Sequence, residues 1–211
     1  MKHKGIVSTV VREIIEQFKL YMVSDETDSL MIDLPDENEF FDCNCYGLTN
    51  SFYVELVLNK WDEPSYKIDA DAPGTIDEDN ILIAITANPN TYKSQLSEIY
   101  YNLIYTFRHE FEHYLQVISD YNRVNKDCYT IPKYKGDSLK TLLKPQEIEP
   151  QVLGYHLQSK KENKPFIEVI NIHLDKLINN NQITFKSDKS KEILISTLLT
   201  HAQKLKLKIN E

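Results

Sequence analysis

The string His109-Glu110-Phe111-Glu112-His113 holds the residues of this sequence best suited to chemistry. On an α-helix, histidines four positions apart lie about 40° apart around the axis and one turn above each other, so both imidazoles can reach one metal ion. Glu110 projects beside them and can accept a proton from a metal-bound water. With 6 His and 17 Glu among 211 residues, a shuffled chain contains such a string with a probability on the order of one per cent. The pattern predicts a catalytic zinc (Zn2+) site.

A catalytic zinc needs a third protein ligand and an open position for water. The downstream segment PQEIEPQV, residues 145–152, offers Glu147 and Glu149. Two helical residues two positions apart point about 200° from each other, so only one of these carboxylates can face the metal. His156 is a further candidate for the third ligand.

Hydrolysis at such a site also needs a donor for the developing oxyanion. Tyr155 and His156 follow the two glutamates by one to two helical turns, and Tyr114 follows His113 directly. Each could act as this donor, although packing is the more common role for such residues.

Some features favour other interpretations. Glu112 is a charge at a position that metallopeptidase signatures usually keep uncharged, so a solvated helix face with paired His and Glu is an alternative to a metal site. Cys43 and Cys45 could chelate a metal, but they lack the spacing of a zinc knuckle, and reduced structural thiols are the better interpretation. An odd set of 3 cysteines fits a reducing, cytoplasmic compartment.

The HExxH string lies within the clearest helical periodicity of the chain, which runs from about Thr91 to Asp120. Its apolar positions recur at three and four residues, which predicts one long helix with a buried stripe. His109 lies about 200° around such a helix from Phe107, so we expect the histidines on the face opposite to this part of the core. The helix face just before His109 carries Tyr101, Asn102 and Tyr105, and we expect these side chains to line a cleft.

HEFEHYLQ (109–116) followed by PQEIEPQV (145–152) resembles the small zincin-type zinc peptidases of the Glu-ligand (gluzincin) kind, above all compact peptidases of phage and bacterial genomes. In those proteins a string of the form EIEA follows the zinc helix, and the resemblance implies Glu149 as the third ligand beside His109 and His113. Pro150 departs from the small residue of that pattern, and proline predicts a helix start close by. The resemblance further implies a β-sheet whose edge strand pairs with an extended substrate.

The remaining elements complete an α+β fold. Apolar spacing predicts a helix over residues 8–22, and alternation predicts strands at 51–61, 66–70 and 81–87. ILIAITA (81–87) is the expected edge strand, with an internal strand as an equal alternative. Residues 24–50 read as a long connection with at most short strands. Further helical patterns are a turn at 139–143, a helix from about 147–149 through 157, and helices at 166–178 and 191–207. We expect a zincin-like domain over 1–160 and a helical extension over 161–211 packed on it.

Composition excludes several classes of function. Residues 1–90 hold 18 acidic and 6 basic side chains, a net charge of −12, and residues 91–211 hold 14 acidic and 18 basic, a net charge of +4. The acidic half argues against a nucleic-acid surface, and the spread lysines of the other half are typical of a solvated face. No apolar run reaches the roughly 18 to 20 residues of a membrane helix. The sequence leaves the oligomeric state open.

These patterns together predict a cytoplasmic zinc-dependent endopeptidase with Glu110 as the general base, Tyr155 as a catalytic oxyanion donor, and a protein or peptide as substrate. A non-catalytic zincin-fold structural or binding protein, such as a viral component, is the alternative from another class. The presence of Glu110 favours the enzyme, because a degenerate zincin is expected to lose its general base. A third alternative is a metal-free helical protein.

Overall fold

The computed structural model describes residues 4–35, 41–45, 48–72, 79–119 and 138–209. The chain divides into two compact units, Met1–Lys126 and Asp127–Glu211, and each is described by itself. The predicted boundary between residues 160 and 161 falls inside a helix of the second unit. The mixture of a small sheet with helices and a helical C-terminal region confirms the predicted α+β class.

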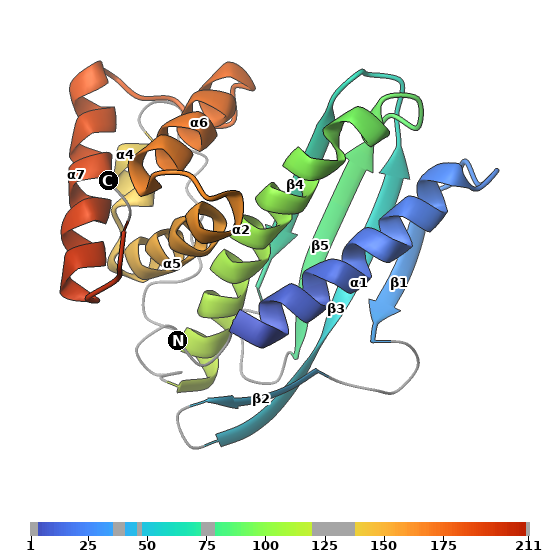
Figure 1. The fold of residues 1–211 in the computed structure, drawn as a ribbon, viewed down its shortest axis with the longest axis horizontal. Helices are drawn as coiled ribbons and strands as arrows, with labels where there is room; N and C mark the ends of the chain where they lie inside the picture. Colours follow the sequence, from blue (N-terminus) through green and yellow to red (C-terminus); the bar gives the residue numbers. More distant parts are fainter. Residues whose placement is uncertain (1–3, 36–40, 46–47, 73–78, 120–137, 210–211) are drawn as a thin grey trace. The chain divides into compact units, whose positions relative to one another are not determined.

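Unit 1 is a mixed sheet with helices on one face (Figure 1). Its strands follow the order β1-β3-β5-β4, with β2 paired to β3 off this path. The pair β3 and β5 is parallel, and the other pairs are antiparallel. The elements are α1 (Lys4–Val23), β1 (Leu30–Leu34), β2 (Phe41–Cys45), β3 (Leu48–Lys60), β4 (Tyr66–Asp71), β5 (Asn80–Ala87) and α2 (Tyr92–Ser119).

The core of unit 1 follows from alternation along β3 and β5. Every second residue of β5 is buried, and the corresponding positions of β3 are fully buried too, because successive side chains of a strand point to opposite faces. The buried set on β3 is Phe52, Val54, Leu56 and Leu58, which is the face that the alternation predicted.

Phe52 is the centre of an aromatic cluster between the sheet and α2. Its ring lies 6.2 Å from that of Phe107, 5.2 Å from Phe111 and 5.4 Å from Tyr114, measured between centroids. The rings of Phe107 and Phe111 are stacked along one side of α2 at 5.9 Å. These contacts fix which side of α2 faces the sheet.

The expectation that ILIAITA forms the edge of the sheet is wrong. This segment is β5, which pairs with β3 on one side and with β4 on the other. Alternation could not settle the point, because an internal strand with one covered face shows the same pattern as an edge strand. Along the main path of the sheet, β1 and β4 are the outer strands.

The predicted connection at residues 24–50 contains β1, β2 and the start of β3. Both β1 and β2 have 5 residues, in line with the expected short strands, whereas β3 begins at Leu48, three positions before its predicted start. Leu30, Ile32 and Leu34 of β1 pair with Leu58, Leu56 and Val54 of β3. Pairing with a long neighbour thus stabilises a strand that is too short to give a clear pattern by itself.

Lys60, at the end of β3, contacts the C-terminal end of α1 and the residues that follow it. Its ammonium donates to the carbonyls of Ser24 and Glu26, each at 2.7 Å, and lies 4.6 Å from the ring centroid of Tyr21. A cation stabilises the C-terminal end of a helix, where the last carbonyls lack partners. The contact joins α1 to the sheet at this end.

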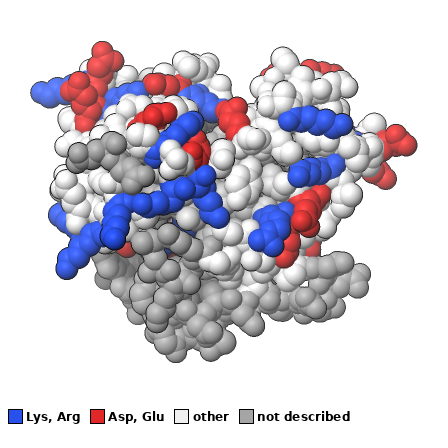
Figure 2. Space-filling view, in the orientation of Figure 1, with Lys and Arg blue, Asp and Glu red and all other residues white. Residues whose placement is uncertain are grey.

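Unit 2 is helical, with α5 in contact with both α6 and α7. Its helices are α4 (Leu139–Leu142), α5 (Pro145–Glu162), α6 (Phe166–Asn179) and α7 (Asp188–Lys204). The helix predicted to start near 147–149 begins at Pro145, and Pro150 lies inside it. Pro145 suits the first helical position, where the amide has no partner in any case. In Figure 2, lysine and arginine side chains form a band over the helices of this unit.

None of the helices in the described ranges combines the length and apolar character that a membrane span requires.

We predict that Phe52→Ala lowers the free energy of unfolding by about 3 to 5 kcal/mol, because it removes the centre of the aromatic cluster. Val57→Ala is the matched control, since Val57 is half-buried on the opposite face of β3. Urea denaturation followed by circular dichroism measures both changes. Equal losses in the two variants would contradict the proposed packing of α2.

Candidate metal centre

Helix α2 brings His109 and His113 together in unit 1. Their Nε2 atoms are 3.1 Å apart, and their ring centroids are 4.8 Å apart. Two imidazole nitrogens bound to one tetrahedral zinc at about 2.0–2.1 Å are separated by about 3.3 Å. The observed separation is close to this value, and it is also that of a hydrogen bond between the two imidazoles.

Glu110 lies beside this pair. Its Oε1 is 3.9 Å from Nε2 of His109, and the side chains of Glu110 and His109 are 15% and 14% exposed. Both side chains are therefore only partly exposed to solvent. The carboxylate is thus close enough to act on a water held next to the imidazoles.

Gln116 orients His113. Its Oε1 lies 3.3 Å from Nδ1 of His113, so it accepts a hydrogen bond when the imidazole proton is on Nδ1. That tautomer directs the lone pair of Nε2 toward His109. Sequence reasoning missed Gln116, although a polar residue three positions after a helical histidine is the available signal.

Aromatic and amide side chains border the histidines on the preceding turns of α2. Tyr101, Asn102 and Tyr105 are half-buried, and the ring of Tyr105 lies 5.8 Å from that of His109. The amide of Asn102 donates to the hydroxyl of Tyr66 on β4. This contact links the turn before the histidines to the edge of the sheet.

Glu112, the unusual charge in the motif, forms an ion pair with Arg108. Its Oε2 is 2.6 Å from Nη1 of Arg108, and the two side chains are 7% and 12% exposed. Neutralisation by Arg108 explains how a carboxylate is accommodated at this position.

Tyr114 has a packing role. It is 1% exposed, belongs to the Phe52 cluster, and donates a hydrogen bond of 3.0 Å to the carbonyl of Ser51. The hydroxyl of Tyr114 is directed to the backbone of β3, so the suggestion that Tyr114 donates to the oxyanion is wrong.

The other predicted site residues belong to α5 in unit 2. Glu147 lies in the first turn of α5, and both Glu147 and Glu149 are half-buried. Tyr155 is 1% exposed with its ring 5.4 Å from that of His173 on α6, and His156 is 2% exposed with Nε2 3.2 Å from the carbonyl of Lys208. The roles of Glu149, Tyr155 and His156 stay predictions.

Comparisons with protein-family models, curated proteins and solved structures find no match for this chain in any of the three.

We predict that Glu112→Ala destabilises the protein by about 3 to 5 kcal/mol, because it leaves the Arg108 guanidinium largely buried without its carboxylate. The double variant Arg108→Met/Glu112→Leu should recover most of this loss. Thermal unfolding by calorimetry measures both. If Glu112→Ala unfolds at the same temperature as the wild type, the ion pair with Arg108 does not stabilise the protein and the prediction is wrong.

Proposed function

We propose that this chain is a zinc-dependent endopeptidase that acts on protein or peptide substrates in the cytoplasm. The observation that carries the proposal is the convergence of the His109 and His113 Nε2 atoms, 3.1 Å apart, beside the Glu110 carboxylate. Two imidazoles would supply two of the three protein ligands that a catalytic zinc needs, and the neighbouring carboxylate would supply the general base. The HExxH resemblance to zincins, stated above, supports the same class of reaction.

Each residue has a defined part in the proposed reaction. His109 and His113 would hold the metal, and Gln116 would keep His113 in the required tautomer. When bound, zinc would supply Lewis-acid polarisation of a water and of the scissile carbonyl. Glu110 accepts the proton of the attacking water and returns it to the leaving amine. Tyr155 stays the predicted oxyanion donor.

We propose that α5 supplies the third ligand, with Glu147 preferred over the sequence-based choice, Glu149. Seven residues along a helix return to nearly the same direction, so Glu149 shares a stripe with His156. His156 is buried against the carbonyl of Lys208 in its own unit. Glu147 lies nine residues before His156, and therefore on the opposite side of α5.

For the substrate, we propose pairing along β4. This strand is an outer strand of the sheet, it packs against α2, and Tyr66 joins it to Asn102 on the turns before the histidines. A peptide could extend the sheet there by main-chain hydrogen bonds. Residues 66–71 thus replace residues 81–87 as the strand that we propose to pair with the substrate.

The catalytic proposal predicts different outcomes for two variants. His113→Ala should lose both zinc and proteolysis, because a metal ligand is removed. Glu110→Gln should keep about one zinc per chain but lose proteolysis, because only the general base is removed. Metal analysis and cleavage of a denatured casein substrate measure these properties.

The control is His201→Gln, which changes a histidine on α7 and should affect neither property. Wild-type protein that takes up no zinc would contradict the proposal. Zinc binding without cleavage of casein or of a diverse peptide library would instead favour the non-catalytic alternative.

Separate Glu147→Ala and Glu149→Ala variants test the third ligand, and each serves as the matched control for the other. We expect Glu147→Ala to weaken zinc binding about 100-fold or more and Glu149→Ala to leave it nearly unchanged. Competition with a chromogenic chelator measures both affinities. The reverse result would restore Glu149, and two unchanged affinities would exclude both glutamates.

A further inference from the structure

A second surface of unit 1 has the features of a binding groove. It lies between the end of α1 and the start of α2 and has a volume of about 600 Å³. Four apolar side chains line it: Leu20, Val23, Tyr92 and Leu96. The distance along α2 from Leu96 to His109 is about 20 Å, so the groove is separate from the candidate metal centre.

The apolar lining is unusually exposed. Leu20 and Val23 are 63% and 64% exposed and lie three positions apart, on adjacent turns of α1. Tyr92 is 3% exposed, and its ring makes an edge contact with Phe18, which fixes the floor of the groove. Exposed apolar side chains that gather around one hollow mark a binding surface more often than scattered ones do.

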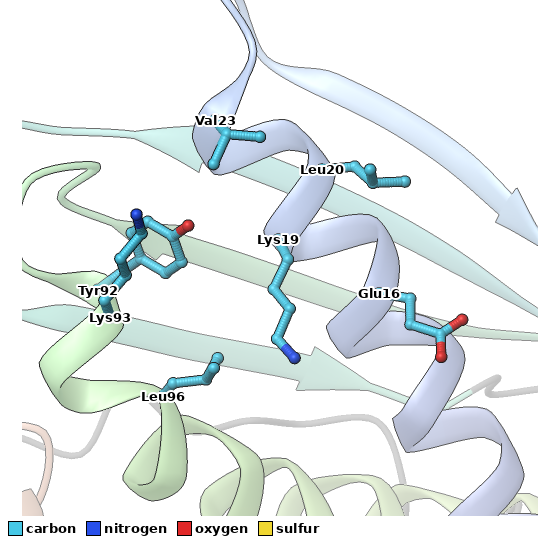
Figure 3. Close-up of a pocket in the computed structure, with 7 residues that line it drawn as sticks. All are labelled: Glu16, Lys19, Leu20, Val23, Tyr92, Lys93 and Leu96. Atoms are coloured by element: carbon cyan, nitrogen blue, oxygen red, sulfur yellow. The ribbon is translucent and has the colours of Figure 1, made fainter.

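Charge around the groove has the opposite sign to that of the unit. Unit 1 contains 22 acidic and 10 basic side chains, a net charge of −12. The groove nevertheless carries Lys19 from α1 and Lys93 from α2. Figure 3 shows Lys19 extending toward Leu96, whereas the carboxylate of Glu16 points to the other side.

The two lysines are available for a partner. Among the described residues, neither Lys19 nor Lys93 takes part in an ion pair. Lys93 also lies in the first turn of α2, where the helix dipole adds positive potential. An apolar strip with an unpaired ammonium on each side complements a helix that has a leucine stripe and flanking carboxylates.

We propose that this groove binds an acidic amphipathic helix of a partner protein. The apolar residues of the partner helix lie on Leu20, Val23, Tyr92 and Leu96, and its acidic flanks pair with the lysines. The inference is independent of the proposed peptidase activity, because none of the lining residues belongs to the metal centre. A groove this open suits the ridge of a helix better than an enclosed small molecule.

The test uses the full chain and a fluorescent helical peptide of about 18 residues with leucines at helical spacing and glutamates on both flanks. A second peptide carries lysines in place of the glutamates. Fluorescence anisotropy should show binding of the acidic peptide and binding at least about tenfold weaker for the basic one. Equal affinities, or no binding of the acidic peptide, would overturn the proposal.

Variants locate the contact. Lys19→Glu/Lys93→Glu and Leu20→Ser should each weaken binding of the acidic peptide about tenfold, while Lys189→Glu, an exposed control on α7, should not. Circular dichroism and the midpoint of urea denaturation verify that each variant is folded. Unchanged affinity in both groove variants would exclude this site.

Other occupants give distinct results. If sedimentation velocity shows a wild-type dimer that Leu20→Ser converts to a monomer, the groove holds a second copy of the chain and the proposal is wrong. Binding to phosphatidylglycerol vesicles that requires the two lysines, without binding of the acidic peptide, would assign the surface to a membrane and also overturn it.

Discussion

The contact of Phe52 with Phe107, Phe111 and Tyr114 sets the rotation of α2 about its own axis. A helix has one orientation in which these three side chains all reach the sheet, because they are spaced at three and four residues. His109 and His113 then point away from Phe52 by geometry alone. The proposed chemistry thus depends on an aromatic contact that contains no chemical group of the site.

The same helix also carries the residues that prepare the histidines. Gln116 contacts Nδ1 of His113 from three positions away, and Arg108 neutralises Glu112 from four positions away. Both contacts are local to α2, so they need no residue from another element. Such local contacts would limit the reorganisation that the proposed metal binding requires.

The parts of the fold that the sequence predicted are those with long periodic patterns. The stripe of α2 and the alternation of β3 are repeated often enough to identify both the element and its buried face. The place of β5 inside the sheet was not predictable, because it depends on pairing with β4 and β3 and leaves no local trace. The choice between Glu147 and Glu149 as the proposed third ligand was not predictable from the sequence either. It depends on which side of α5 packs against the other helices of its own unit. Proline is most common in the first turn of a helix, so Pro150 favoured a start at 147–149. In the structure Pro150 is a buried residue inside α5, which begins at Pro145.

The central claim is that one zinc ion binds to two imidazoles of α2 and a carboxylate. X-ray absorption spectroscopy of the zinc-loaded protein tests it most directly, because sulfur and nitrogen or oxygen ligands differ in bond length. Ligation by two imidazoles and a carboxylate gives a first shell of nitrogen and oxygen at about 2.0 Å, with outer-shell scattering from two imidazoles. A zinc–sulfur distance of about 2.3 Å, which would indicate ligation by cysteines such as Cys43 and Cys45, would contradict it.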